Sequence, residues 1–115
     1  MHKTALVAFL ASMIWTRPSV ADGFLLGRDL MDFCRNTEHS AQQICKGYIV
    51  GTYDTILMFQ EISVVQKNIC LPSRTKLADI VEVAKSYLVK NASKSSYSAS
   101  SLVLTALKER YQCQK

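Results

Sequence analysis

Apolar residues recur at helical spacing along most of the chain after residue 24, while the alternation typical of strands is nearly absent. Four segments carry apolar side chains on one face at i, i+3, i+4 and i+7. They span residues 24–35, 41–65, 76–90 and 98–111. The β-branched run "ISVV" at 62–65 continues the second segment, so we expect it to extend that helix. The pattern predicts an all-α fold, a small antiparallel bundle of about four helices.

Residues that start and stop helices agree with this division. Pro72 is predicted to end the second helix, because proline has no backbone N–H to donate. Ser73 or Thr75 is then placed to cap the third helix, and Ser96 or Ser98 the fourth, each by accepting a backbone N–H bond. The connections are short, and short connections favour antiparallel neighbours.

Two glycines stand inside the second segment. Gly47 and Gly51 lie four residues apart in "KGYIVG" and therefore share one face of the helix. Because glycine has no side chain, the pair leaves a notch in that face. We expect another helix to approach closely there.

The first 21 residues have the layout of a secretory signal peptide. A basic start at Lys3 precedes an apolar run over residues 5–15, and the small-x-small signal "SVA" ends the segment. The run is too short to span a bilayer. A first core helix is the alternative, which the helix-breaking pair "RP" disfavours. We predict cleavage after Ala21, which leaves residues 22–115 as one exported domain.

Export affects how the cysteines are interpreted, because disulfides form in oxidising compartments outside the cytosol. The four cysteines all follow the leader, at Cys34, Cys45, Cys70 and Cys113. An even number in a small exported domain predicts two disulfides. If the helices alternate in direction, Cys34 lies near Cys45, and Cys70 lies near Cys113. A zinc site is the alternative, but the spacings contain no C-x-x-C pair and His39 is the one histidine after the leader.

The net charge is mildly positive, and the basic side chains are scattered along the sequence. The chain has 14 Lys and Arg against 9 Asp and Glu, a net charge of +5, and loss of Lys3 and Arg17 with the leader lowers it to +3. A nucleic-acid interface needs a clustered basic stripe, which this sequence lacks. The balance favours an acidic partner surface instead.

Candidates for catalysis are few. His39 stands in the polar stretch "NTEHSAQQ", where a solvated residue at a helix start is the plain interpretation. Asp29 and Asp32 share a helix face, with Arg28 and Arg35 near enough to neutralise them. No phosphate loop, metal motif or nucleophile paired with a base is present in the sequence. We therefore predict a binding protein without a cofactor or catalytic residues.

The connection between the third and fourth segments, "NASKSSYSAS" at 91–100, is rich in hydroxyl groups. One interpretation is an ordinary solvated loop with Tyr97 packed back on its own helix. The other is a binding loop. Its serine hydroxyls and backbone amides can donate and accept hydrogen bonds, Lys94 can reach an acidic wall, and Tyr97 is a rigid amphipathic anchor.

The order of motifs is specific. The chain shows "CKGYIVGTYD" at 45–54, "CLP" at 70–72, "LADIVEVAKSYL" at 77–88 and "ASSLVLTALKERYQC" at 99–113. This frame resembles the Rap/Tai family of type VI secretion amidase immunity proteins, in the branch that neutralises family-4 amidase effectors. The resemblance covers essentially all of the chain after the leader.

The resemblance implies a periplasmic, mostly helical homodimer that binds a papain-like Cys–His peptidoglycan amidase in a 2:2 complex. A protruding loop of such inhibitors enters the substrate groove of the enzyme. The expected contact residues of this chain are therefore those of the serine-rich connection, namely Asn91, Ser93, Lys94, Ser95, Ser96 and Tyr97. The long second helix is the expected dimer surface, because one neighbour cannot cover all its apolar side chains.

A small periplasmic acid-stress chaperone is the alternative of another class, since such proteins are also helical and disulfide-bonded. Its switch would depend on protonating many carboxylates in acid. The nine acidic side chains of this chain make that switch weak.

Overall fold

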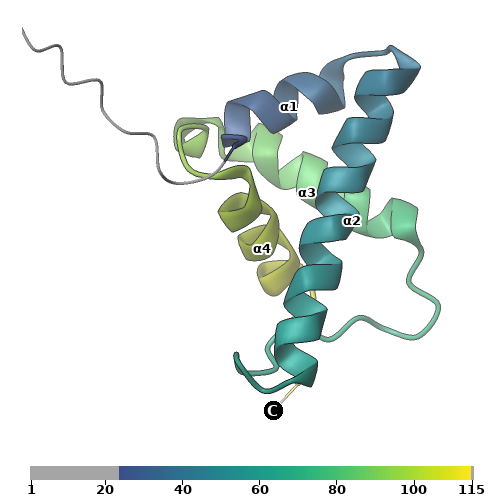
Figure 1. The fold of residues 1–115 in the computed structure, drawn as a ribbon, viewed down its shortest axis with the longest axis vertical. Helices are drawn as coiled ribbons and strands as arrows, with labels where there is room; N and C mark the ends of the chain where they lie inside the picture. Colours follow the sequence, from purple (N-terminus) through teal and green to yellow (C-terminus); the bar gives the residue numbers. More distant parts are fainter. Residues whose placement is uncertain (1–23, 115) are drawn as a thin grey trace, which may run out of the picture.

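The computed structural model describes residues 24–114, and within that range the protein is all-α (Figure 1). It contains α1 (Gly27–Arg35), α2 (His39–Glu61), α3 (Leu77–Lys90), a short 3-10 turn η1 (Ala92–Lys94) and α4 (Ala99–Arg110). No strand longer than an isolated bridge forms among the described residues. The all-α prediction is confirmed. The predicted leader and its cleavage site after Ala21 lie outside the described residues.

The helices pack around one apolar core. α2 runs most of the length of the molecule, with α1 across its upper end, α4 beside it and α3 behind (Figure 1). The largest side chains with almost no exposed surface are Leu30, Cys45, Ile49, Val103 and Leu107. They come from α1, α2 and α4, and the buried face of α3 joins the same cluster. No helix within residues 24–114 has the length and apolar character needed to cross a membrane.

The second helix is shorter than predicted. α2 ends at Glu61, and the next residues turn away because Ser63 adopts a left-handed conformation with φ 59°. The backbone N–H groups of Val64 and Val65 both donate to the carbonyl of Phe59. The expectation that 62–65 extends the helix was wrong, as was the expectation that Pro72 ends it. Ile62, Val64 and Val65 are exposed, so burial does not offset the low helix propensity of the β-branched run.

The start of α3 also differs from the prediction. Its N-cap is Lys76, whose backbone N–H donates to the carboxylate of Asp79 over 2.8 Å. The hydroxyl of Thr75 donates instead to the carbonyl of Pro72. The prediction that Ser73 or Thr75 caps this helix was therefore wrong.

The start of α4 agrees with the prediction. Ser98 is the N-cap, and its hydroxyl accepts a hydrogen bond from the backbone N–H of Ser101 over 3.4 Å. Of the two serines proposed as the cap, the structure uses Ser98 and leaves Ser96 exposed.

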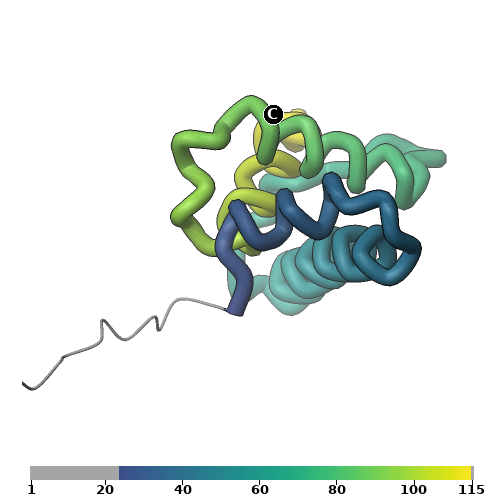
Figure 2. Tube along the Cα trace, turned by 90° about the horizontal axis from the view of Figure 1, so that it is seen from above, coloured from purple at the N-terminus to yellow at the C-terminus, as the bar shows by residue number. Residues whose placement is uncertain are grey.

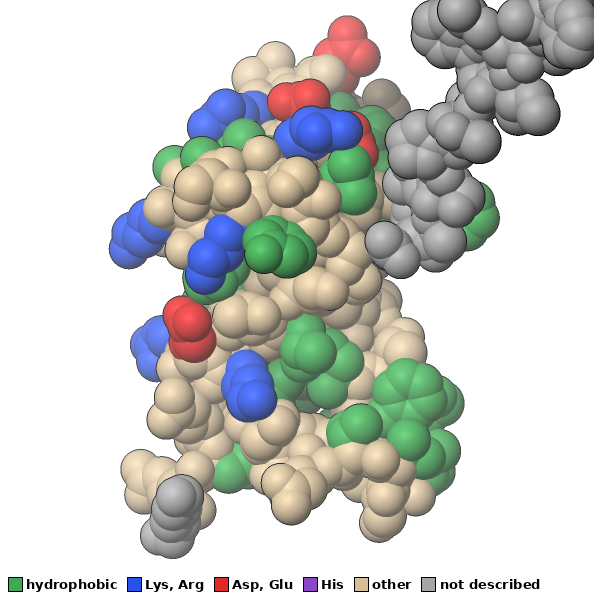
Figure 3. Space-filling model, turned by 90° about the vertical axis from the view of Figure 1, so that its left-hand side faces the viewer, with side chains coloured by type: hydrophobic (Ala, Val, Ile, Leu, Met, Phe, Trp, Pro, Cys, Tyr) green, Lys and Arg blue, Asp and Glu red, His purple; other side chains and the backbone are tan. Residues whose placement is uncertain are grey.

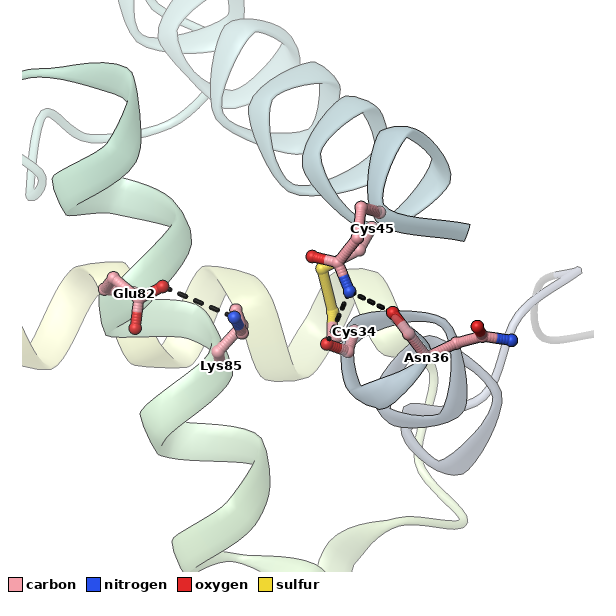
Figure 4. The surroundings of a disulfide bond; sticks show 6 residues. Cys34, Asn36, Cys45, Glu82 and Lys85 are labelled. Atoms are coloured by element: carbon pink, nitrogen blue, oxygen red, sulfur yellow. Dashed lines mark hydrogen bonds and ion pairs between the residues drawn. A yellow bond between two sulfur atoms is a disulfide. The ribbon is translucent and has the colours of Figure 1, made fainter. Parts of the chain in front are cut away.

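Both predicted disulfides form, and all four cysteines are paired. Cys34–Cys45 joins the end of α1 to the first part of α2, where the carbonyls of Cys34 and Asn36 also accept hydrogen bonds from the side chain of Gln42 (Figure 4). Cys70–Cys113 closes a separation of 43 residues near the other end of the chain. Since every cysteine is oxidised, none is available as a zinc ligand.

A buried glutamine holds the long connection between α2 and α3. The Oε1 of Gln60 accepts hydrogen bonds from the backbone N–H groups of Asn68 and Ile69, at 3.0 and 3.1 Å. Its Nε2 donates to the carbonyl of Ile69 at 3.3 Å. Ile69 is almost fully buried and forms an isolated bridge with Gln112. Gln60 therefore fixes the chain beside the Cys70–Cys113 disulfide.

Candidate functional site

The serine-rich connection leaves α3 at Asn91. The backbone N–H and the side-chain amide of Asn91 both donate to the carbonyl of Tyr87, each over 2.9 Å. Asn91 is half-buried and ends the helix, so its side chain is engaged within the chain. This candidate contact residue has a structural role.

Beyond Asn91 the chain makes the η1 turn and one further turn, closed by the bond from the N–H of Tyr97 to the carbonyl of Lys94, before α4. The exposed candidates in this loop are Ser93, Lys94, Ser96 and Tyr97, while Ser95 is half-buried. The Tyr97 side chain keeps 61% of its surface exposed, so it does not pack back on α4. Four of the six predicted contact residues therefore lie on one projecting loop with their side chains in solvent.

The loop is attached to the start of α1 through its backbone. The N–H of Gly27 donates to the carbonyl of Tyr97 over 2.8 Å, and the N–H of Arg28 donates to that of Ser95 over 3.0 Å. The first backbone donors of a helix have no partner inside the helix, so these carbonyls satisfy them. Figures 1 and 2 both place the yellow-green loop beside the N-terminal end of α1.

Gly27 makes this close approach possible. A Cβ built on Gly27 would lie 2.4 Å from the Cδ1 of Leu102 and 3.3 Å from both the Cα and the carbonyl oxygen of Ser95. A side chain at this position would displace the Leu102 side chain and would press on the loop backbone at Ser95. Sequence reasoning missed Gly27, because its role depends on contacts with residues almost 70 positions away. A glycine near the start of the predicted segment 24–35 was the available signal.

Of the two aspartates of α1, Asp29 stabilises the start of the helix. The carboxylate of Asp29 accepts a hydrogen bond from the backbone N–H of Leu26 over 2.8 Å, at the start of α1. Asp32 is exposed and, with Asp29, Phe33 and Asn36, lines a shallow hollow of about 230 Å³. His39 is exposed at the first position of α2. Among residues 24–114, no three His, Cys, Asp or Glu side chains gather as a metal site.

A second feature is an open groove between α2 and α4, with a volume of about 590 Å³. Small and apolar side chains line it, including Gly47, Gly51, Ile56, Phe59 and Leu104. A Cβ on Gly47 or Gly51 would meet no atom within 4 Å. The expectation that a helix packs closely against these glycines was wrong within this chain, because α4 lies far enough away to leave the groove open.

Further apolar side chains are exposed near this groove, at the end of α2 and in the turn after it. They are Met58, Ile62, Val64 and Val65. Figure 3 shows hydrophobic side chains gathered on the lower half of the molecule, around a hollow. The chain thus carries two distinct surfaces, a polar loop and an apolar groove.

A comparison with family models finds one match. The model of the Rap1a immunity proteins matches residues 26–113, which include all four helices, both disulfides and the loop. A search of the curated proteins gives no match.

Proposed function

Because the chain belongs to the Rap1a immunity protein family, we propose that it inhibits a cognate type VI secretion peptidoglycan amidase by placing its serine-rich loop in the active-site groove. The immunity role follows from the family, which implies a cognate effector as partner and favours an inhibitor over an acid-stress chaperone. The amidase as the target and the loop as the inhibitory element are what we propose. One observation carries it: a projecting loop that is fixed by backbone bonds and presents four polar or aromatic side chains to solvent.

The fixed backbone suits an inhibitor. A loop that is already ordered loses less conformational entropy on binding, so more of the contact energy appears as affinity. Tyr97 offers a rigid aromatic ring, and such rings recur among the residues that dominate interfaces. The hydroxyls of Ser93 and Ser96 can pair with the polar groups of a groove that binds peptides.

We also propose that a second copy covers the groove between α2 and α4, giving a homodimer and a 2:2 complex. A glycine inside a helix destabilises it by about 0.5–1 kcal/mol relative to alanine. Among residues 24–114, no atom occupies the space that Gly47 and Gly51 leave. A helix of a second copy would use it and would also cover Phe59 and Ile56.

Export completes the proposal. We propose a periplasmic location with the leader cleaved after Ala21, where an oxidising compartment maintains both disulfides. The intact mass of the protein recovered from the periplasm should correspond to residues 22–115 with four oxidised cysteines. A mass that includes the leader would contradict the cleavage.

The loop is tested by alanine substitution, which leaves the backbone bonds in place. We expect the variant Ser93→Ala/Lys94→Ala/Ser96→Ala/Tyr97→Ala to fold normally and to bind the amidase encoded beside the immunity gene at least 100-fold more weakly. Isothermal calorimetry and a peptidoglycan hydrolysis assay measure the two effects. The control Lys67→Ala/Ser73→Ala removes exposed side chains of the same kinds from the other long connection and should bind normally. Unchanged inhibition by the loop variant would exclude the loop as the inhibitory element.

The groove is tested by filling it. We expect Gly51→Leu to shift the protein from dimer to monomer in analytical ultracentrifugation, because the added side chain occupies the space of the partner helix. Ala78→Leu adds the same bulk at an exposed position of α3 and should remain a dimer. A monomeric wild-type protein, or a dimer that survives Gly51→Leu, would contradict the proposal.

A further inference from the structure

The residues before α1 form a single surface with the serine-rich loop. Besides the two bonds that Gly27 and Arg28 donate to the loop, the N–H of Ala99 donates to the carbonyl of Leu25 over 2.9 Å. Leu26 and Ser98 form an antiparallel bridge. Backbone bonds therefore run on both sides of this contact and hold residues 25–28 against the loop, with Phe24 directly before them.

This surface exposes a second aromatic ring. The side chain of Phe24 is fully exposed, at 106% of its reference surface, three residues before Gly27. No contact within the described chain buries it, although burial of a phenylalanine is worth about 1.5–3 kcal/mol. Tyr97, on the neighbouring segment, is also exposed. Two aromatic side chains thus flank one pair of bonded segments.

The charges of this surface are positive. Arg28 and Lys94 are both exposed, and neither forms an ion pair within residues 24–114. The nearest carboxylate in sequence, that of Asp29, accepts a hydrogen bond from the N–H of Leu26 and is half-buried. The exposed carboxylate of Asp32 lies one turn further along α1, but it forms no ion pair with Arg28. The surface therefore presents two cations that are not engaged in ion pairs.

We infer that segment 24–28 is a second half of the effector-binding surface, in which Phe24 enters an apolar notch of the effector and Arg28 acts with Lys94 on acidic side chains at the rim of its groove. The inference rests on the proposed function, since it assumes that the loop contacts the effector. It adds a partner of defined chemistry, namely a peptide-binding groove with an acidic rim and an apolar notch beside it. Two paired segments would hold such a rim more precisely than one loop.

The test measures the affinity of the mature chain for the amidase encoded beside the immunity gene. We expect Phe24→Ala to weaken binding about tenfold, with unchanged thermal stability because the ring is fully exposed. Arg28→Glu should weaken binding at least tenfold and should lower the association rate most at low salt. Arg35→Glu, at the exposed C-terminal end of the same helix, is the matched control and should bind within twofold of the wild type.

The outcomes separate the two proposals. If Tyr97→Ala weakens binding while Phe24→Ala and Arg28→Glu do not, the loop acts alone and the inference is wrong. If none of the three substitutions changes the affinity, the proposal that the serine-rich loop is the inhibitory element is wrong. If Phe24→Ala changes the oligomeric state of the protein without effector and leaves the effector affinity unchanged, segment 24–28 contacts a second copy. The inference is then also wrong.

Discussion

The backbone N–H of Gly27 donates to the carbonyl of Tyr97 over 2.8 Å, which joins the first residue of α1 to the most exposed aromatic residue of the loop. The two residues lie 70 positions apart in the sequence, yet the conformation of one depends on the other. The position of the serine-rich loop consequently depends on the packing of α1 against it. Changes at the start of α1 should therefore alter effector binding without touching the loop.

Gly27→Ala tests this coupling. The added Cβ meets Leu102 at 2.4 Å and the backbone of Ser95 at 3.3 Å, so we expect a loss of about 1–3 kcal/mol in the free energy of unfolding. Binding of the effector should weaken because the loop is displaced. Urea denaturation and calorimetry measure the two effects.

Gly47→Ala is the matched control. Within the single chain a Cβ there meets no atom within 4 Å, and alanine favours the helix by about 0.5–1 kcal/mol over glycine. The variant should therefore be more stable than the wild type in unfolding measured at concentrations where the protein is monomeric. Equal losses for Gly27→Ala and Gly47→Ala would mean that the close contact at Gly27 is not what limits stability.

Gln60 offers a test of the connection between α2 and α3. Gln60→Ala leaves the buried N–H and carbonyl of Ile69 without their partners, so we expect a loss of about 2–4 kcal/mol in the free energy of unfolding. Gln66→Ala removes an exposed glutamine of the same connection and should change it by less than about 0.5 kcal/mol. A small effect at Gln60 would show that water replaces its hydrogen bonds.

The cap of α4 gives a smaller effect at the edge of the loop. Ser98→Ala removes the acceptor for the N–H of Ser101, and we expect it to cost about 1 kcal/mol in thermal or urea unfolding. Ser96→Ala, two residues earlier and exposed, should leave stability unchanged. If both serines have equal effects on stability, the cap assignment is wrong.

The sequence predicted those features that depend on local periodicity. The apolar repeats located all four helices, and their alternating direction paired Cys34 with Cys45 and Cys70 with Cys113. Ser98 was among the predicted caps because a serine cap acts on a neighbour three residues away. Family motifs then pointed to the loop as the binding element, which stays a prediction.

Features that depend on distant contacts were not predicted. Gly27 and Gln60 act on residues brought near by the fold, and their sequence neighbours give no sign of those partners. The same limit explains the error at residues 62–65, where an apolar run ends up exposed. Gly47 and Gly51 were recognised as a notch, but the sequence could not say that the chain leaves it empty.

Alkaline pH should destabilise the protein through Tyr53. Partial burial first, and the carboxylates of Asp54 and Glu61 second, raise the pKa of Tyr53 above its usual value of about 10. The folded state therefore holds this proton more tightly than the unfolded chain. The resulting stabilisation is present below the unfolded pKa and is lost as pH rises through the folded one. Urea unfolding from neutral to alkaline pH should show a smaller decline for Tyr53→Phe than for the wild type, and equal declines would contradict this.

Loss of the long-range disulfide should weaken the fold and leave the serine-rich loop and the start of α1 intact. Cys70–Cys113 closes a separation of 43 residues, so replacing both cysteines by alanine should cost about 4 kcal/mol through the entropy of the unfolded chain. Against a typical total of about 5–15 kcal/mol, this is a large fraction, and urea denaturation measures it directly. Figure 1 places the C-terminus at the end of the molecule opposite the loop and the start of α1. The molecules that remain folded should therefore bind the effector with wild-type affinity. A variant with the same free energy of unfolding as the wild type would show that the disulfide does not stabilise the fold. A variant that stays folded yet fails to bind would show that the disulfide shapes the proposed binding surface.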